Sequence, residues 1–117
     1  MNTPAISELF SLPPDVKKIE HVDDTKAKHA AKFVMHLEDH TAGNLLRYSL
    51  LRNENVKFSG YRRPHPLENK IELKVHTNGK ISPKEAAKQA CDNLCTEFIK
   101  MKEAFLMQVK EFKGEGK

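Results

Sequence analysis

The feature that most constrains this chain is one long helical segment near its C-terminus. Ser82, Pro83 and Glu85 place a hydroxyl at the N-cap, a proline at the first helical position and a carboxylate at the third. Each residue type suits its position at a helix start. No proline or glycine follows until Gly114, so the pattern predicts a helix of about 30 residues, or about 45 Å.

The segment before this helix alternates between strand and helix patterns. Apolar and polar residues alternate over 31–38, 56–60 and 71–76, which is the period of half-buried strands. A spacing of three and four predicts a helix over 41–52, and Tyr48 and Leu51 widen its apolar arc enough for a second surface to cover it. The pattern predicts an α+β fold: a small antiparallel sheet with one short helix and one long C-terminal helix, dimerising through its helices.

The long helix exceeds what such a sheet can cover. Three strands of about 20–25 Å leave the distal half of the helix without a neighbour, so we expect it to pack against another chain. Its apolar residues recur at alternating steps of four and three, the spacing of a coiled-coil seam. The seam comprises Ala87, Cys91, Leu94, Phe98, Met101, Phe105 and Phe112, broadened by Ala90, Ile99, Leu106 and Val109.

Residues 1–30 differ from the rest because they mix prolines with clustered charges. This composition predicts an extended arm with a short strand over 17–22. We expect the apolar cluster around Leu9 and Phe10 in this arm to pack against another surface, because clustered apolar side chains are costly to leave exposed. We therefore divide the chain into an arm over 1–30, a dimerisation domain over 31–113 and a tail over 114–117.

Composition excludes several classes of protein. A length of 117 residues allows one modest domain. The net charge of +4 arises from 20 basic and 16 acidic residues, an excess too small to indicate nucleic-acid binding. We expect a protein that is neither secreted nor membrane-embedded, because no apolar run approaches the roughly 18 residues of a membrane span and the N-terminus lacks signal-peptide features. A bridge between Cys91 and Cys95 would close a trivial loop, which favours a reducing compartment.

No catalytic residue, metal site or cofactor is predicted. The six histidines form no HExxH motif, and Cys91 and Cys95 cannot complete a tetrahedral site, so we expect them to be buried core thiols. Asp39, His40 and Thr41 supply residue types of a hydrolytic triad, an alternative function. Their position at a helix start favours capping instead.

Two other features have open interpretations. Gly43 lies inside the first predicted helix, where glycine costs about 1 kcal/mol relative to alanine, so we expect another element to approach it closely. A basic strip across two strands would suit a homodimeric nucleic-acid-binding module or simply mark the solvated side of the sheet. The strip consists of Lys57, Arg62, Arg63, Lys70 and Lys74.

Three runs carry a family resemblance: EDHTAGNLLR at 38–47, VKFSGY at 56–61 and PHPL at 64–67. Together they resemble the small α-like subunits of RNA polymerase, a group that includes the bacterial α amino-terminal domain and the archaeal small assembly subunits. The resemblance continues through 70–77 and the Ser82 helix start, and covers about residues 31–112. The motif residues are Asp39, His40, Thr41, Gly43, Asn44, Gly60, Tyr61, His65 and Pro66.

The arm favours one eukaryotic branch of this family. Pro4, the run 8–10 and the run 24–26 resemble the subunit of RNA polymerase II. The alternative is the small subunit shared by polymerases I and III, which runs 46–48 and 58–61 would also suit. Two departures from the family pattern are Ala42, where a bulkier aliphatic residue is usual, and the basic pair Arg62 and Arg63.

The resemblance implies a non-catalytic nuclear subunit that heterodimerises with the larger α-like polymerase subunit. It implies a platform for the large catalytic subunits in mRNA transcription, with other core subunits as further partners, DNA contacted only through the complex, and no membrane or cofactor. Asp39, His40, Gly43 and Asn44 would shape the turn that aims the first helix. The expected partner-binding residues, in a four-helix contact, are Leu45, Leu46, Leu50, Leu94, Phe98, Met101, Phe105 and Val109.

Overall fold

The structure, a computed structural model, describes residues 12 and 14–115. It has the α+β architecture that the sequence predicts, with both helices and the three strands of the domain within a few residues of their expected bounds. The elements in chain order are β1 (Ile19–Asp23), β2 (Ala30–His36), α1 (His40–Leu51), β3 (Val56–Arg62), β4 (Lys70–Thr77) and α2 (Pro83–Glu115).

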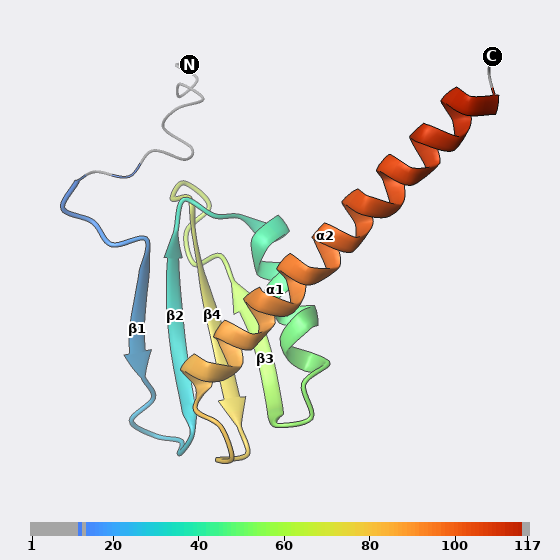
Figure 1. Cartoon of the computed structure of the whole chain (residues 1–117). Coiled ribbons are helices and arrows are strands. Elements are labelled where there is room, and N and C mark those ends of the chain that lie inside the picture. Colours follow the sequence, from blue (N-terminus) through green and yellow to red (C-terminus); the bar gives the residue numbers. More distant parts are fainter. Residues whose placement is uncertain (1–11, 13, 116–117) are drawn as a thin grey trace.

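The sheet is antiparallel throughout, in the order β1-β2-β4-β3 (Figure 1). The described residues form four strands rather than the three expected in the domain, because β1 from the N-terminal arm pairs along the free edge of β2. The candidate strand over 17–22 is thus real, and it belongs to the sheet. All five β1 residues are exposed, so backbone pairing holds this strand more than burial does.

Both helices pack on the same face of the sheet. Phe33 lies opposite Leu73, and Ala31 opposite Val75, across the β2–β4 ladder, so these four side chains project to one face. They form a single buried cluster with Leu50 of α1 and with two alanines of α2, Ala86 and Ala90. The small alanine side chains let the first turns of α2 approach the sheet closely.

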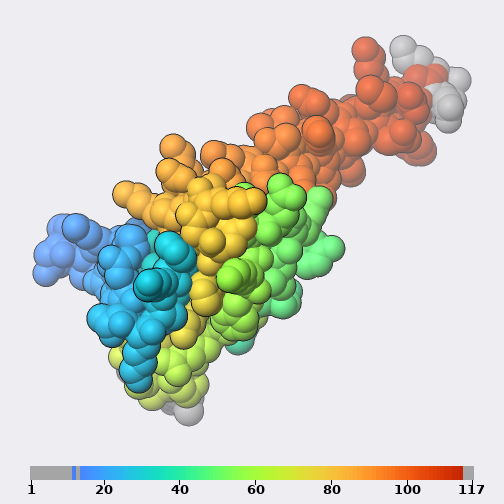
Figure 2. All heavy atoms as spheres, turned by 90° about the horizontal axis from the view of Figure 1, so that it is seen from below, coloured from blue at the N-terminus to red at the C-terminus, as the bar shows by residue number. Residues whose placement is uncertain are grey.

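Helix α2 extends well beyond this core. Its 33 residues span about 50 Å, and the distal half projects away from the sheet and α1 (Figures 1 and 2). The sequence places its end at Gly114, but the helix continues to Glu115. One exposed glycine in a last turn costs only about 1 kcal/mol, which does not force an end.

Candidate protein interface

The exposed apolar side chains concentrate on the two helices. Of the fourteen large apolar residues that are exposed in the described part of the chain, ten belong to α1 or α2. Single exposed apolar residues are ordinary on protein surfaces, whereas a concentrated set marks an interface. On α1 and α2 these residues are Leu45, Tyr48, Leu51, Phe98, Ile99, Met101, Phe105, Leu106, Met107 and Phe112. Met107 lies about 200° around the helix axis from Phe105 and is not counted as part of the candidate interface.

The distal half of α2 carries most of this surface. Phe98, Met101 and Phe105 are 48%, 64% and 67% exposed although they occupy core-type positions of a helical seam. Leu94 and Val109 are half-buried. The buried core includes α2 only at its first turns, through Ala86 and Ala90. The distal half of the helix projects away from the sheet and α1 (Figure 2), which leaves Phe98, Met101 and Phe105 about half exposed or more. We use "α2 seam" below for Leu94, Phe98, Met101, Phe105 and Phe112.

Helix α1 divides its leucines between the core and the surface. Leu45 is exposed, and Leu46 packs against the edge of the core. Leu50, which the sequence places in the partner contact, has no exposed surface and lies in the chain's own core, so this expectation is corrected. Tyr48 and Leu51 are exposed in its stead, which fits the second covering surface that their position predicts.

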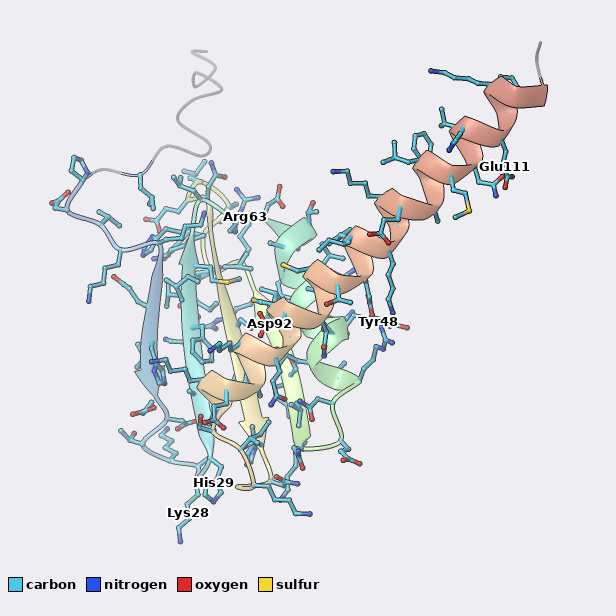
Figure 3. The ribbon with its side chains drawn as sticks, in the orientation of Figure 1. Lys28, His29, Tyr48, Arg63, Asp92 and Glu111 are labelled. Atoms are coloured by element: carbon cyan, nitrogen blue, oxygen red, sulfur yellow. The ribbon has the colours of Figure 1, made fainter. Side chains whose placement is uncertain are left out.

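Polar contacts fix α1 against the base of α2. The buried Ser49 hydroxyl donates to the Ala90 carbonyl oxygen at 3.2 Å. Arg52 forms an ion pair with Glu97 at 2.6 Å and lies 6.0 Å from the centroid of the Tyr48 ring. These contacts therefore fix the position of α1 relative to α2, and with it the relative position of their exposed apolar residues. In Figure 3, Tyr48 marks α1 and Glu111 marks the distal half of α2.

The motif residues at the start of α1 are used structurally. Asp39 is the N-cap and its Oδ1 accepts from the Thr41 backbone N–H at 2.9 Å. This bond, more than any nearby charge, lowers the pKa of Asp39. A 3.0 Å hydrogen bond joins His40 Nδ1 to the Tyr61 hydroxyl. The capping interpretation of Asp39 is confirmed, and the His40 ring bonds the Tyr61 hydroxyl.

Gly43 is the position where another element approaches most closely, as the sequence predicts. A Cβ added to Gly43 would lie 2.6 Å from Cδ2 of Tyr61, so only glycine allows the β3 tyrosine to rest on the helix backbone. A similar arrangement exists in β3, where a Cβ on Gly60 would lie 3.0 Å from the Phe58 ring. Asn44 accepts from Arg47 at 2.6 Å on the exposed side of α1.

The remaining motif residues, His65 and Pro66, lie in the exposed loop between β3 and β4. Their backbone carbonyls serve the loop itself, since His65 accepts from the Glu68 N–H at 3.2 Å and Pro66 accepts from Arg63 Nη2 at 3.3 Å. Neither side chain contributes to the helical apolar surface.

Three of the five residues of the basic strip lie against carboxylates. Arg62 bonds Glu72 at 2.8 Å, Lys70 contacts Glu68 at 3.2 Å, and Lys74 lies 3.6 Å from Asp24. The hydrogen bond from Arg62 lowers the pKa of Glu72, against the opposing effect of burial. Because these cations already face carboxylates, the solvated-sheet interpretation is favoured over a phosphate-binding surface.

In the described part of the chain, no group of three or more His, Cys, Asp or Glu side chains converges as the ligands of a metal ion would. Cys91 and Cys95 are both free, but they are exposed and not in the core as expected. Their helical positions turn them away from the alanines that face the sheet. Partial burial of its sulfur still raises the pKa of the Cys91 thiol. Within residues 12 and 14–115, no helix is long and apolar enough to cross a membrane.

Comparison with known proteins identifies the family. The model of the RNA polymerase Rpb3/Rpb11 dimerisation domain matches residues 30–104. The chain belongs to this family. The match spans β2 to the middle of α2, so it includes the core and the first half of the α2 seam, while Phe105 and Phe112 lie beyond it.

Curated relatives of this dimerisation domain carry a consistent description. The chain is 40% identical over 111 residues to "DNA-directed RNA polymerase II subunit rpb11" of Dictyostelium discoideum, covering 95% of this chain and 92% of the relative. It is 44% identical over 97 residues to "Probable DNA-directed RNA polymerase II subunit RPB11" of Caenorhabditis elegans, covering 83% and 79%. Both names belong to the polymerase II branch that the sequence favours.

A solved structure shares the fold. The crystal structure of DNA-directed RNA polymerase subunit L from Thermoplasma acidophilum superposes with a TM-score of 0.67 and 18% identity, covering 84% of this chain and 96% of that one. The predicted α-like fold, a small antiparallel sheet with one short and one long helix, is therefore confirmed.

Proposed function

We propose that this chain is the small α-like subunit of RNA polymerase II and forms a heterodimer with the larger α-like subunit. The observation that carries the proposal is the apolar surface on α1 and the distal half of α2, including Phe98 and Phe105. The family description names two subunits, Rpb3 and Rpb11, which supports pairing with a different chain over pairing with a second copy.

The contact would be made by α1 and the α2 seam packing against helices of the partner. An aromatic side chain gains about 1.5–3 kcal/mol when it passes from exposed to fully buried, and the α2 seam holds three phenylalanines that are at least 48% exposed. The residues of this chain that we propose to contact the partner are Leu45, Leu46, Leu94, Phe98, Met101, Phe105 and Val109. Because Tyr48 and Leu51 are also exposed on α1, we add them to this set.

The subunit would act in assembly and not in catalysis. Its acidic and basic motif residues are engaged in a helix cap and in an interaction with Tyr61, which leaves nucleotide transfer to other subunits. We infer that the heterodimer is a platform for the large catalytic subunits in mRNA transcription, that it works in the nucleus, and that it meets DNA only through the complex.

Light scattering after size exclusion tests the heterodimer. The chain is co-expressed with the larger α-like subunit, and we expect a one-to-one complex. Phe105→Asp and Phe98→Asp are expected to abolish it, because each would bury an unpaired charge. Normal heterodimers with both variants would refute the proposed interface.

A matched control comes from the same helix. Met107 is 61% exposed, close to the 67% of Phe105, but two residues along an α-helix place it about 200° around the axis. Met107→Asp therefore makes the same chemical change on the opposite side of α2, and we expect it to leave the one-to-one mass unchanged. Loss of the complex with this variant too would point to general damage of α2.

A further inference from the structure

Lys102 lies inside the apolar surface of the distal half of α2. Residues three and four positions apart are neighbours on a helix, and those at these distances from Lys102 are Phe98, Ile99, Phe105 and Leu106. All four are at least 48% exposed. Lys102 itself is exposed, and none of the ion pairs among the described residues includes it. An unpaired cation is therefore surrounded by exposed apolar side chains.

The apolar surface extends to both sides of Lys102. At about 100° per residue, the large apolar residues from 98 to 112, apart from Met107, span an arc of about 160° around α2, from Met101 to Ile99. Lys102 lies about 20° from the middle of this arc. The apolar stripe of an ordinary amphipathic helix is about 100° wide. A partner that covers the whole arc therefore packs on both sides of Lys102 and takes its ammonium group out of water.

This chain has no carboxylate with which to neutralise that ammonium group. Between positions 98 and 112, the acidic residues of α2 are Glu103 and Glu111, which lie about 40° and 80° outside the arc. Glu97, one residue before this segment, is already paired with Arg52. Helix α1, which completes the apolar surface, contains no acidic residue. A second copy of the chain would thus bring another lysine to this face and no carboxylate.

A buried ammonium group without a counter-charge is strongly unfavourable, so the charge of Lys102 restricts which surface can cover α2. We propose that Lys102 forms an ion pair with a carboxylate of the larger α-like subunit, and that this pair selects that subunit over a second copy of the chain. The inference rests on the proposed function and specifies what the partner brings, namely an apolar helical surface with an acidic residue facing Lys102.

Two further observations support this assignment. The match to the dimerisation domain, over residues 30–104, includes Lys102, which supports coverage of this part of α2 by the dimerisation partner. In coiled coils, a single polar or charged residue within an apolar seam specifies the register and the oligomeric state at some cost in stability. Lys102 occupies the corresponding place in the apolar surface of α2.

Competition for a limiting amount of the larger α-like subunit tests the ion pair. The wild-type chain and a Lys102→Met chain are co-expressed with it, and their ratio in the purified heterodimer is measured by mass spectrometry. Methionine has a helix propensity close to that of lysine, but it leaves the partner's carboxylate buried without a cation. We expect the wild-type chain to exceed the variant by about a hundredfold. Equal amounts, or an excess of the variant, would overturn the inference and show that the ammonium group reaches water.

Lys100→Met is the matched control on the same helix. Lys100 is also exposed, but its neighbours three and four positions away include no large apolar residue; they are Thr96, Glu97, Glu103 and Ala104. This variant should share the larger subunit with the wild-type chain to within about twofold, because exposed charges contribute little. A deficit as large as that of Lys102→Met would show a general effect of lost charge and would also overturn the inference.

Light scattering of each chain alone tests the selection against a second copy. Lys102→Met removes the charge that opposes burial of this face, so the variant should self-associate at a concentration at least about tenfold lower than the wild-type chain. An unchanged concentration would overturn this part of the inference.

A charge swap identifies the partner's carboxylate. Lys102→Glu is combined with larger α-like subunits in which one acidic residue of the contacting helices at a time is changed to lysine. We expect Lys102→Glu to lose the heterodimer with the unchanged partner, and one partner variant to restore it. Restoration by none of them would overturn the ion pair. Failure of the wild-type chain to form any heterodimer would refute the proposed function instead.

Discussion

Replacing Gly43 with alanine tests the close contact between α1 and β3. The new methyl group would lie 2.6 Å from Cδ2 and 2.9 Å from Cγ of Tyr61, closer than real carbon atoms approach. Because both backbones belong to packed elements, the tyrosine ring has to move. That displacement would also pull the Tyr61 hydroxyl away from His40 Nδ1, which it now meets at 3.0 Å.

The sign of the effect follows from three magnitudes. Alanine is favoured over glycine inside a helix by about 1 kcal/mol. Against this, overpacking costs about 1–3 kcal/mol, and the loss of a hydrogen bond costs about 0.5–1.5 kcal/mol. The balance is a destabilisation of about 2 kcal/mol, which corresponds to a fall in Tm of roughly 6–12 °C for a domain of this size.

Thermal unfolding of the full chain at one fixed concentration, followed by circular dichroism, measures this change. Gly114→Ala is the matched control, because nothing lies within 4 Å of the position where its Cβ would be; its Tm should stay the same or rise. In a Tyr61→Ala background, Gly43→Ala should cost nothing. A chain made more stable by Gly43→Ala alone, or an unchanged cost without the tyrosine ring, would refute the reasoning.

Two more predictions concern the core and an ion pair. Leu50→Ala should lower the free energy of unfolding by about 2–5 kcal/mol in urea titrations, because Leu50 is fully buried; a cost below 1 kcal/mol, on the order of a surface change, would contradict its core position. The Arg62 hydrogen bond lowers the pKa of Glu72 in the folded chain. The ion pair therefore stabilises the folded chain fully at pH values above the ordinary glutamate pKa of about 4.3. This stabilisation is lost as the pH falls through the lower pKa of Glu72 in the folded chain. Glu72→Gln should therefore shrink the drop in urea midpoint between pH 6 and pH 3, and an unchanged drop would argue against the pair.

Local patterns in the sequence determined most of the fold. Apolar and polar residues alternate in the strands, and apolar residues recur every three or four positions in α1. Each period matches the backbone geometry that places the apolar side chains on one buried face. Ser82 accepts from the Glu85 N–H at 3.1 Å, as the helix-start signal predicts. The motif at 38–47 and the seam of α2 were sufficient to predict both the α-like family and the need for a partner.

The sequence predicted the candidate interface less completely than the fold, because an apolar residue can face either the chain's own core or a partner. Helix α1 is apolar on more than one side, so spacing alone does not say that Leu50 turns inward while Tyr48 and Leu51 face outward. The exposure of Cys91 and Cys95 likewise depends on which side of α2 meets the sheet.

What the sequence by itself determined was therefore the set of elements, their order and the excess of apolar surface on a helix too long for its sheet. Only the tertiary structure decided how that surface is divided between core and partner. The Tyr61 ring against Gly43 and the alanines of α2 against the sheet set the orientation of both helices. Such long-range contacts arise between segments far apart in the chain, and local periodicity carries no information about which of them will meet.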